Sequence, residues 1–267
     1  MVRRKALRSR RPTVRLKRPA EVSAMGRAGR VVAQALREVA AASEPGVTTG
    51  QLNKIVDDVI TAAGGIASFK GVPAIVPGGP AFPAASCVSV NEEVVHGLPG
   101  ERVLRSGDIV SVDVGVILDG WHGDAAVTVG VGPIGPQAEL LVRVTREALL
   151  AGIDAARAGG WLGDISAAIQ AQGEKHGLAV VRDFTGHAIG REMHEGFQIP
   201  NFGVPKTGMR LRAGMTMAIE PMFTLGSAEV AIRSDGWTVT TVDNSLSAHW
   251  EHTIAVTDGE PAVLTVE

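Results

Sequence analysis

The sequence has little cysteine, few aromatic residues, no tyrosine and no long hydrophobic run. A single cysteine, Cys87, excludes an intramolecular disulfide and favours a reducing compartment, which we take to be the cytoplasm. No apolar stretch approaches the roughly 18 residues that span a bilayer, so we expect no contact with a membrane interior. With 45% hydrophobic and 20% charged residues, the chain can form one large core.

Several motifs of common enzyme classes are also absent. The sequence contains no His-Glu-x-x-His zinc motif, no cysteine pair, no phosphate-binding Walker loop and no Gly-x-Ser-x-Gly nucleophile turn. What is present instead is a set of carboxylates and histidines in apolar or glycine-rich surroundings.

Positive charge is concentrated at the N-terminus. Residues 1–20 carry nine Lys and Arg side chains and no acid, and subtracting those nine from the net charge of −2 leaves −11 for the rest. Such an arm suggests contact with an anionic partner, for example the ribosome. A disordered, solvated tail is an equal alternative, and the composition would also suit an organellar transit peptide. We expect an unstructured arm, 1–20, and one folded domain, 21–267.

The order of elements indicates a duplicated α+β fold. Hydrophobic periodicity predicts two pairs of helices, each followed by strands, with helices over 21–42, from 48 to the glycines at 64–65, near 136–157 and over 162–174. Thr48 and Gln51 have capping-box spacing. Asp119-Gly120 predicts a two-residue hairpin turn between alternating strands.

A repeated pattern supports the duplication. Leu104-Arg105-Ser106-Gly107 leads to Asp113, and Leu211-Arg212-Ala213-Gly214 leads to Glu220, in both cases nine residues after the leucine. The strand that follows each of these also carries an early acid, Asp124 in the first half and Glu251 in the second. Each half thus supplies two carboxylates at matching places.

The hairpin brings its two acids together. With Asp119-Gly120 as the turn, Asp113 and Asp124 become diagonal neighbours on one face, close enough for their side chains to converge. Converging carboxylates need a proton, a cationic side chain or a metal, and no Lys or Arg occurs between 108 and 131. An amphipathic hairpin with both acids in solvent is the alternative. Glu220 disfavours it, because we place that acid in the middle of an apolar strand.

Histidines could supply nitrogen ligands. His187 lies between glycines in Gly186-His187-Ala188-Ile189-Gly190, where backbone can approach a site closely. His194 follows seven residues later, and His96 precedes Gly97. For any one of them, a structural or surface histidine is the commoner case.

These residues resemble the bacterial type I methionine aminopeptidases. Motifs carry the resemblance in the family's order between residues 20 and 264, at 91–99, 112–114 with 119–124, 186–195, 218–222 and 251–253. The resemblance implies the pita-bread fold, an α+β domain whose duplicated halves, related by a pseudo-twofold axis, form a curved antiparallel sheet. It also implies two divalent metal ions, Co, Mn, Fe or Zn. The implied metal ligands are Asp113, Asp124, His187, Glu220 and Glu251.

The resemblance further implies a mechanism and an activity. Asp124 and Glu251 would bridge the metals, a bridging water would be the nucleophile, and Glu220 would accept its proton. His194 and His96 would line the cleft and contact the substrate. The implied activity is removal of the initiator methionine from nascent proteins, by a protein that is a monomer.

The substrate pocket departs from the family pattern more than the metal site does. Members usually carry Gly-Tyr-x-Gly-Tyr/Phe-Pro before the pocket cysteine. Here Val72 stands at the first aromatic position, Phe82-Pro83 stands at the second, and the loop over 71–85 is longer. An apolar slot would still suit a methionine side chain. We expect it to be lined by Cys87, Phe82, Met193 and Trp237.

Two other functions stay open at this stage. One is a catalytically weak binding module on the same fold, which the presence of all the ligand positions disfavours. The other is a related aminopeptidase with an altered first-residue preference, such as a proline-specific peptidase. The altered loop over 71–85 is compatible with this alternative.

Overall fold

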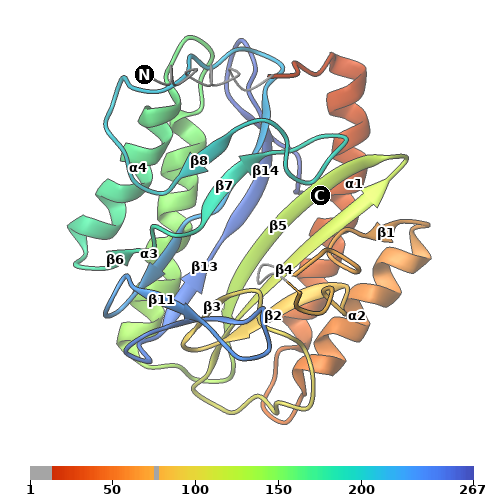
Figure 1. Cartoon of the computed structure of the whole chain (residues 1–267), viewed down its shortest axis with the longest axis vertical. Helices are drawn as coiled ribbons and strands as arrows, with labels where there is room; N and C mark the ends of the chain where they lie inside the picture. The colour runs from red at the N-terminus through yellow and green to blue at the C-terminus, as the bar shows by residue number, and fades with distance from the viewer. Residues whose placement is uncertain (1–13, 75–77) are drawn as a thin grey trace, which may run out of the picture.

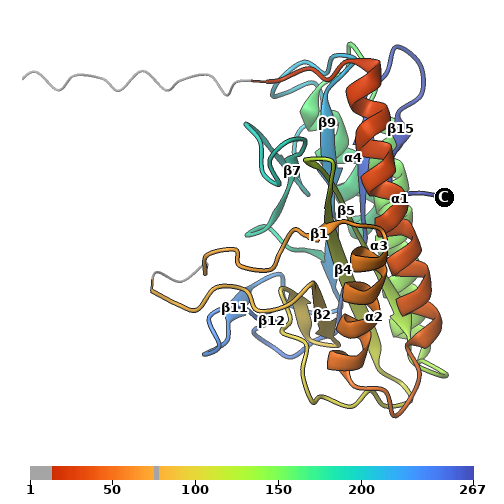
Figure 2. The ribbon, with the colours of Figure 1, turned by 90° about the vertical axis from the view of Figure 1, so that its right-hand side faces the viewer.

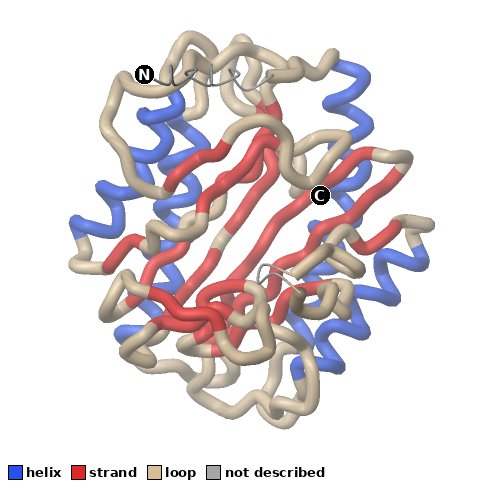
Figure 3. The backbone as a smooth tube through the Cα atoms, in the orientation of Figure 1, coloured by secondary structure: helices blue, strands red, loops and turns tan. Residues whose placement is uncertain are grey.

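An antiparallel sheet crosses the centre of the molecule, and helices cover one of its faces (Figures 1 and 2). The computed structural model describes residues 14–74 and 78–267. The strand order of the main sheet is β1-β4-β5-β14-β9-β7-β8, with β2 beside β4 and β15 beside β14. Figure 3 shows its strands running between two groups of helices. The α+β class with an antiparallel sheet is therefore confirmed.

The elements follow the predicted order. The helices are α1 (Pro19–Ala42), α2 (Thr49–Ala62), α3 (Pro136–Ala155) and α4 (Leu162–Lys175). The strands of the main sheet are β1 (Ile66–Ala67), β2 (Ser86–Val90), β4 (Ile109–Leu118), β5 (Trp121–Gly130), β7 (Thr185–Ala188), β8 (Gln198–Pro200), β9 (Thr216–Ile219), β14 (Glu251–Ala255) and β15 (Ala262–Val263). Two small sheets contain β3 (Glu93–Val95), β6 (Ala179–Val180), β10 (Met222–Thr224), β11 (Val230–Ile232), β12 (Val239–Thr241) and β13 (Ser247–His249).

Local sequence signals set the helix starts and the hairpin. The Thr48 hydroxyl accepts a hydrogen bond from Gln51 N, and the Gln51 side chain returns one to Thr48 N, which confirms the predicted capping box. In the β4–β5 hairpin Leu118 pairs with Trp121. Asp119 and Gly120 both have positive φ, as this turn type requires.

The duplication is visible in matched turns. Gly107 and Gly214 have φ values of 99° and 88°, a region that glycine enters without a Cβ clash. Gly107 N donates to Val131 O at 2.9 Å, and Gly214 N donates to Val256 O, also at 2.9 Å. The repeated Leu-Arg-x-Gly segments thus form the same turn in both halves, as their sequence predicts.

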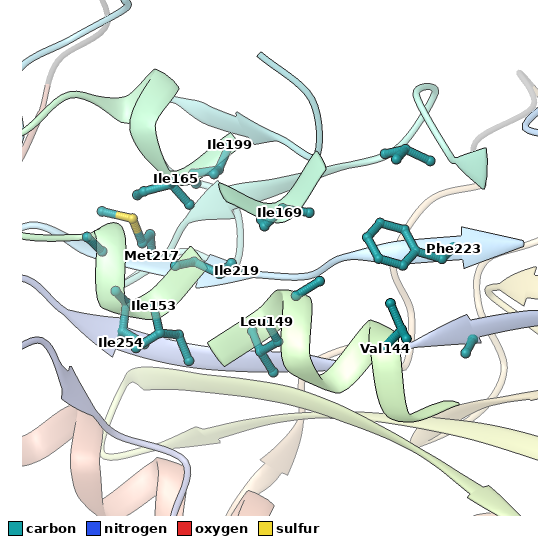
Figure 4. Packing of buried hydrophobic residues seen from close by; sticks show 14 of the residues in the cluster. Val144, Leu149, Ile153, Ile165, Ile169, Ile199, Met217, Ile219, Phe223 and Ile254 are labelled. Atoms are coloured by element: carbon teal, nitrogen blue, oxygen red, sulfur yellow. The ribbon is translucent and has the colours of Figure 1, made fainter. Parts of the chain in front are cut away.

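Each half buries its own core against its own pair of helices. In the first half, the even-numbered valines of β4 pack against α1 and α2. In the second half, Met217 and Ile219 of β9 and Ile254 of β14 pack with apolar residues of α3 and α4 (Figure 4). Because side chains alternate along a strand, the odd-numbered residues of β4, including Asp113, point to the face that the helices leave open.

The structure differs from the predictions at two places. Glu220 does not lie in the middle of a strand, because β9 ends at Ile219 and Pro221, which has no N–H to continue a ladder, follows. Helix α1 begins at Pro19, two residues before the predicted start and inside the predicted arm. The prediction of an unstructured segment for residues 1–13 lies outside the described residues. Among the described residues, no helix is long and apolar enough to cross a membrane.

The segment before α1 is anchored to a loop of the second half. Lys17 is 5% exposed, and its Nζ forms an ion pair with Glu195 Oε2. Lys17 N donates to Gly214 O at 2.7 Å. A Cβ on Gly190 would lie 2.6 Å from Lys17 Cε and 2.3 Å from Glu195 Oε1, so only glycine leaves room for this pair. The pair therefore fixes the loop over 190–195, which precedes β8.

Replacing Lys17 by Met is expected to destabilise the fold by about 3 kcal/mol, because Glu195 loses its buried partner. Urea denaturation of metal-free protein would measure the change in the free energy of unfolding. Arg18→Met is the matched control, since its ion pair with Glu21 lies at the surface, where ion pairs contribute little to stability. Equal effects of the two substitutions would contradict the anchoring role of Lys17.

Candidate metal centre

Four carboxylates and a histidine from both halves meet on the open face of the sheet. Asp113 pairs across the ladder with Ala126, Gly115 pairs with Asp124, and Glu251 pairs with Ala126 from the other side. The predicted hairpin register is thus confirmed, and the small side chain of Ala126 lies between two acids. His187 in β7 and Glu220, directly after β9, approach from the far side of β14 and line the same cleft.

The donor atoms of this group lie close together. His187 Nε2 is 3.6 Å from Asp124 Oδ2 and 3.6 Å from Glu220 Oε1. Ligand atoms of Asp124, His187 and Glu251 all lie within 4.8 Å of one another, and all three residues are buried. The structure therefore brings together all five residues that the sequence singled out as metal ligands.

The group lacks a countercharge among the residues described. Asp113 Oδ1, Asp124 Oδ1 and Glu251 Oε1 are buried without a hydrogen-bond partner. No Lys or Arg is among the residues described as lining the cleft. A cluster of oxygen donors with one imidazole and no internal cation fits divalent metal ions such as Mn²⁺, Fe²⁺ or Co²⁺, so the residues present suit the metals that the resemblance implies.

Burial shifts the pKa values of this group. It raises the pKa of Asp124 to about 8. Burial and the neighbouring carboxylates raise the pKa values of Asp113, Glu220 and Glu251 well above the ordinary range. Burial lowers the pKa of His187 to about 4, so its imidazole is neutral and free to ligate at pH 7.

These shifts predict how the stability of metal-free protein depends on pH. Raised carboxyl pKa values mean that folded chains hold protons that unfolded chains release, so stability falls as pH rises through the folded pKa. The buried histidines have lowered pKa values, so they make stability rise with pH. They do so only below the pKa of about 6.5 that a histidine has in the unfolded chain. The carboxyls therefore dominate between pH 6.5 and about 8.

We expect the free energy of unfolding of chelator-treated protein to fall across that window by roughly 1.4 kcal/mol per pH unit for each retained proton. Urea denaturation at several pH values would measure it. Added Mn²⁺ should abolish the fall, because metal ions displace these protons. A stability that rises from pH 6.5 to 8 without metal would contradict this account of the cluster.

The candidate metal ligands line a cleft with a cavity volume of about 260 Å³. Every residue predicted for the substrate side lines it: His96, His194, Cys87, Phe82, Met193 and Trp237. Phe82 and Trp237 pack edge to face, with ring centroids 5.0 Å apart. Burial and the adjacent Asp113 raise the pKa of the Cys87 thiol well above its usual value. This makes Cys87 an apolar wall and not a nucleophile.

The two histidines predicted for the substrate side of the cleft, His96 and His194, are held in different ways. His96 has φ of 58°, a strained conformation for a residue other than glycine, and its ring packs against Phe184 at 5.4 Å. The His194 ring centroid is 4.3 Å from that of His187, at the exposed end of the cleft. Burial of His96 and partial burial of His194, each with a nearby histidine, lower the pKa of each ring to about 4, so both are neutral at pH 7.

The loop anchored by Lys17 carries two of these residues. Met193 and His194 lie directly before Glu195, whose N donates to Ala188 O at 2.7 Å. Glu195 Oε1 also accepts from Arg191 N at 2.9 Å. The N-terminal segment thus contributes to the shape of the cleft without lining it.

Sequence reasoning missed several cleft residues, among them Phe69, Phe184 and His249. His249 could have been found, because it stands two residues before Glu251 and alternation along an extended chain places both on one face. Phe69 and Phe184 lie in segments without a regular period, where no sequence signal indicates which way a side chain points.

Comparisons with known proteins agree with this geometry. The model of metallopeptidase family M24 matches residues 23–258. The chain is 46% identical over 251 residues to a methionine aminopeptidase of Clostridium perfringens, covering 94% of this chain and 98% of that protein. It is 46% identical to methionine aminopeptidase 1 of Mycobacterium tuberculosis, covering 92% of each.

Solved structures show the same architecture. The crystal structure of methionine aminopeptidase from Thermotoga maritima has a TM-score of 0.91 at 47% identity, covering 96% of this chain and all of that one. A Xaa-Pro dipeptidase from Bacillus anthracis, 20% identical with a TM-score of 0.74, shares the fold; the alignment covers 94% of this chain and 62% of that one. The duplicated sheet is thus the expected pita-bread fold, and this chain belongs to metallopeptidase family M24.

Proposed function

We propose that this chain is a methionine aminopeptidase, a metal-dependent hydrolase that removes the first methionine from peptides and nascent proteins. One observation carries the proposal: a buried cluster of four carboxylates and His187 forms the floor of a small apolar cleft. The cleft of about 260 Å³ has room for a methionine side chain. Asp113 in its lining can receive a free α-amine, which would confine the action to the first residue.

In this proposal Asp113, Asp124, His187, Glu220 and Glu251 hold two divalent metal ions. Such ions, when bound, lower the pKa of a coordinated water and polarise the scissile carbonyl. Side chains of the protein accept the proton of that water and bind the substrate. Glu220 is the proton acceptor, and Asp113 receives the free α-amine of the substrate.

The cleft residues position the peptide. His96 and His194, both neutral, can hydrogen-bond the carbonyl oxygen or the scissile nitrogen. Phe82, Cys87 and Trp237 surround the methionine side chain with apolar and aromatic surface, where its sulfur makes favourable contacts. Met193 adds a flexible side chain to the lining of the slot, so the slot can adapt to its occupant.

Hydrolysis of short peptides tests the proposal. Metal-free protein, reloaded with Mn²⁺ or Co²⁺, would be given Met-Gly-Met-Met, a peptide with Leu first and a peptide with Pro second. We expect metal-dependent release of the first methionine and little release of leucine. Two metals bound without cleavage of any peptide would support a binding module, and faster cleavage of the Leu-first peptide would show an altered preference.

We further propose a cytoplasmic monomer whose basic N-terminal residues contact ribosomal RNA. The proposal is supported by the charge of the first 20 residues, of which 1–13 lie outside the described part. Deleting residues 1–13 should abolish ribosome co-sedimentation, and added salt should weaken it in the full chain. Co-sedimentation that is insensitive to salt would contradict a contact through charge.

A further inference from the structure

His249, to which no role has been assigned so far, faces two of the glutamates of the metal centre. It is 2% exposed and ends β13, two residues before Glu251. Its Nε2 lies 3.9 Å from Glu220 Oε2 and 3.9 Å from Glu251 Oε2. This nitrogen has no hydrogen-bond partner among the described residues. A buried, unpaired nitrogen directed at carboxylates indicates an interaction that these groups make when they are charged.

The backbone of His249 is fixed from both sides. His249 N donates to Thr128 Oγ1 at 2.9 Å, and the Thr128 hydroxyl donates back to His249 O at 2.6 Å. Because the Thr128 proton is used there, the Ser111 hydroxyl donates to Thr128 Oγ1 at 2.7 Å. On its other side His249 pairs with Met222 of β10. This frame holds the imidazole in the cleft, as a preorganised site requires.

The two oxygens of Glu220 face different imidazoles. Oε1 lies 3.6 Å from His187 Nε2, and Oε2 lies 3.9 Å from His249 Nε2. Oε1 is placed to share a metal ion with His187, which leaves Oε2 in need of a hydrogen-bond donor. A neutral imidazole can carry its proton on Nε2 and supply one. The distance from His249 Nε2 to Glu220 Oε2 is about 1 Å longer than a hydrogen bond. The terminal torsion of a glutamate side chain is soft enough to shorten this distance.

We propose that His249 is a positioning residue of the metal centre, whose Nε2–H donates to Glu220 Oε2 and holds Oε1 toward the metal shared with His187. Outer partners of this kind orient metal ligands and tune metal affinity. The inference rests on the proposed metal site, but it does not depend on which peptide the enzyme cleaves. It extends the centre beyond the residues that the sequence motifs contain.

Calorimetric titration of metal-free protein with MnCl₂ tests the proposal without any substrate. His249→Leu removes the donor, whereas His249→Gln keeps an N–H of similar reach. His249→Asn, which keeps polarity but is too short to reach Glu220, serves if the Leu variant does not fold. His252→Gln is the control, because that histidine is also partly buried but bonds Thr265 Oγ1 through Nδ1 at 2.8 Å, away from the cleft.

We expect His249→Leu and His249→Asn to weaken Mn²⁺ binding by about 10- to 100-fold, and His249→Gln to restore most of the affinity. Unchanged affinity in the Leu or Asn variant would overturn the proposal. A Gln variant as weak as the Leu variant would also overturn it, because the imidazole would then be a ligand and not a donor. Because no peptide is present in the titration, the change in Mn²⁺ affinity can be interpreted even if the protein does not release methionine.

Discussion

Replacing Glu220 by Gln is expected to lower kcat for a Met-first peptide by about 10³-fold, with the fold intact. Glutamine matches glutamate in size and can still accept a hydrogen bond, but it cannot take a proton from water at neutral pH. The position tolerates the change sterically, because Glu220 follows the end of β9 and its side chain faces the cleft. The loss should appear in kcat more than in KM, since the proposed proton transfer to Glu220 belongs to the transition state.

Steady-state kinetics with Mn²⁺-loaded protein would measure the loss, and Mn²⁺ titration would show whether the variant still binds metal. Glu229→Gln, an exposed change in the same half, is the matched control. A Gln variant that binds metal and loses less than about tenfold in kcat would exclude Glu220 as the proton acceptor, since general base catalysis is worth 10²-fold or more.

Replacing Asp124 by Asn should have opposite effects on metal binding and on the stability of metal-free protein. Asp124 is 3% exposed, and its carboxylate lies beside His187 at the centre of the cluster. Changes to residues that only support a metal ligand cost about 10- to 100-fold in affinity. If Asp124 is a ligand, as proposed, its loss should therefore lower the affinity by at least the larger of these factors. We therefore expect Mn²⁺ affinity to fall by about 100-fold or more, with loss of activity.

Without metal, the same substitution should stabilise the fold above pH 8. Burial raises the pKa of Asp124 to about 8, so ionising it in the folded chain opposes folding as pH rises through that value. Asparagine removes this charge. Replacing a charged group of a functional site often stabilises a fold while it impairs function. Urea denaturation above pH 8 would measure the gain. Asp119→Asn in the exposed hairpin turn is the control, because asparagine also accepts its positive φ.

A destabilised Asp124→Asn variant in metal-free protein would show that the carboxylate has a structural partner within the chain. Metal affinity unchanged by the substitution would show that the ions bind elsewhere. Either outcome would contradict the assignment of the cluster.

The sequence predicted the parts of the structure that depend on local chemistry and alternation. Asp119-Gly120 determined the hairpin register, and that register placed Asp113 diagonal to Asp124. Thr48 and Gln51 predicted the start of α2. The repeated Leu-Arg-x-Gly segments predicted the duplication, because each needs the same glycine conformation.

Features that depend on long-range packing were not predictable in this way. The ion pair of Lys17 with Glu195 joins residues 178 positions apart, and nothing local to Lys17 distinguishes it from the neighbouring basic residues. The end of β9 before Glu220 was misjudged, because the apolar composition outweighed the effect of Pro221. His249 lies outside the carboxylate pattern that marks the cluster in the sequence, although its spacing of two residues from Glu251 indicates the shared face.

Anomalous diffraction from crystals soaked in Mn²⁺ is the most direct test of the central claim that both halves of the chain together hold two catalytic metal ions. The account predicts two ions about 3.5–4 Å apart. Asp124 and Glu251 should lie between them, Asp113 on one side, and His187 with Glu220 on the other. The absence of ions at this cluster, or ions held by residues outside it while methionine is still released, would contradict the account.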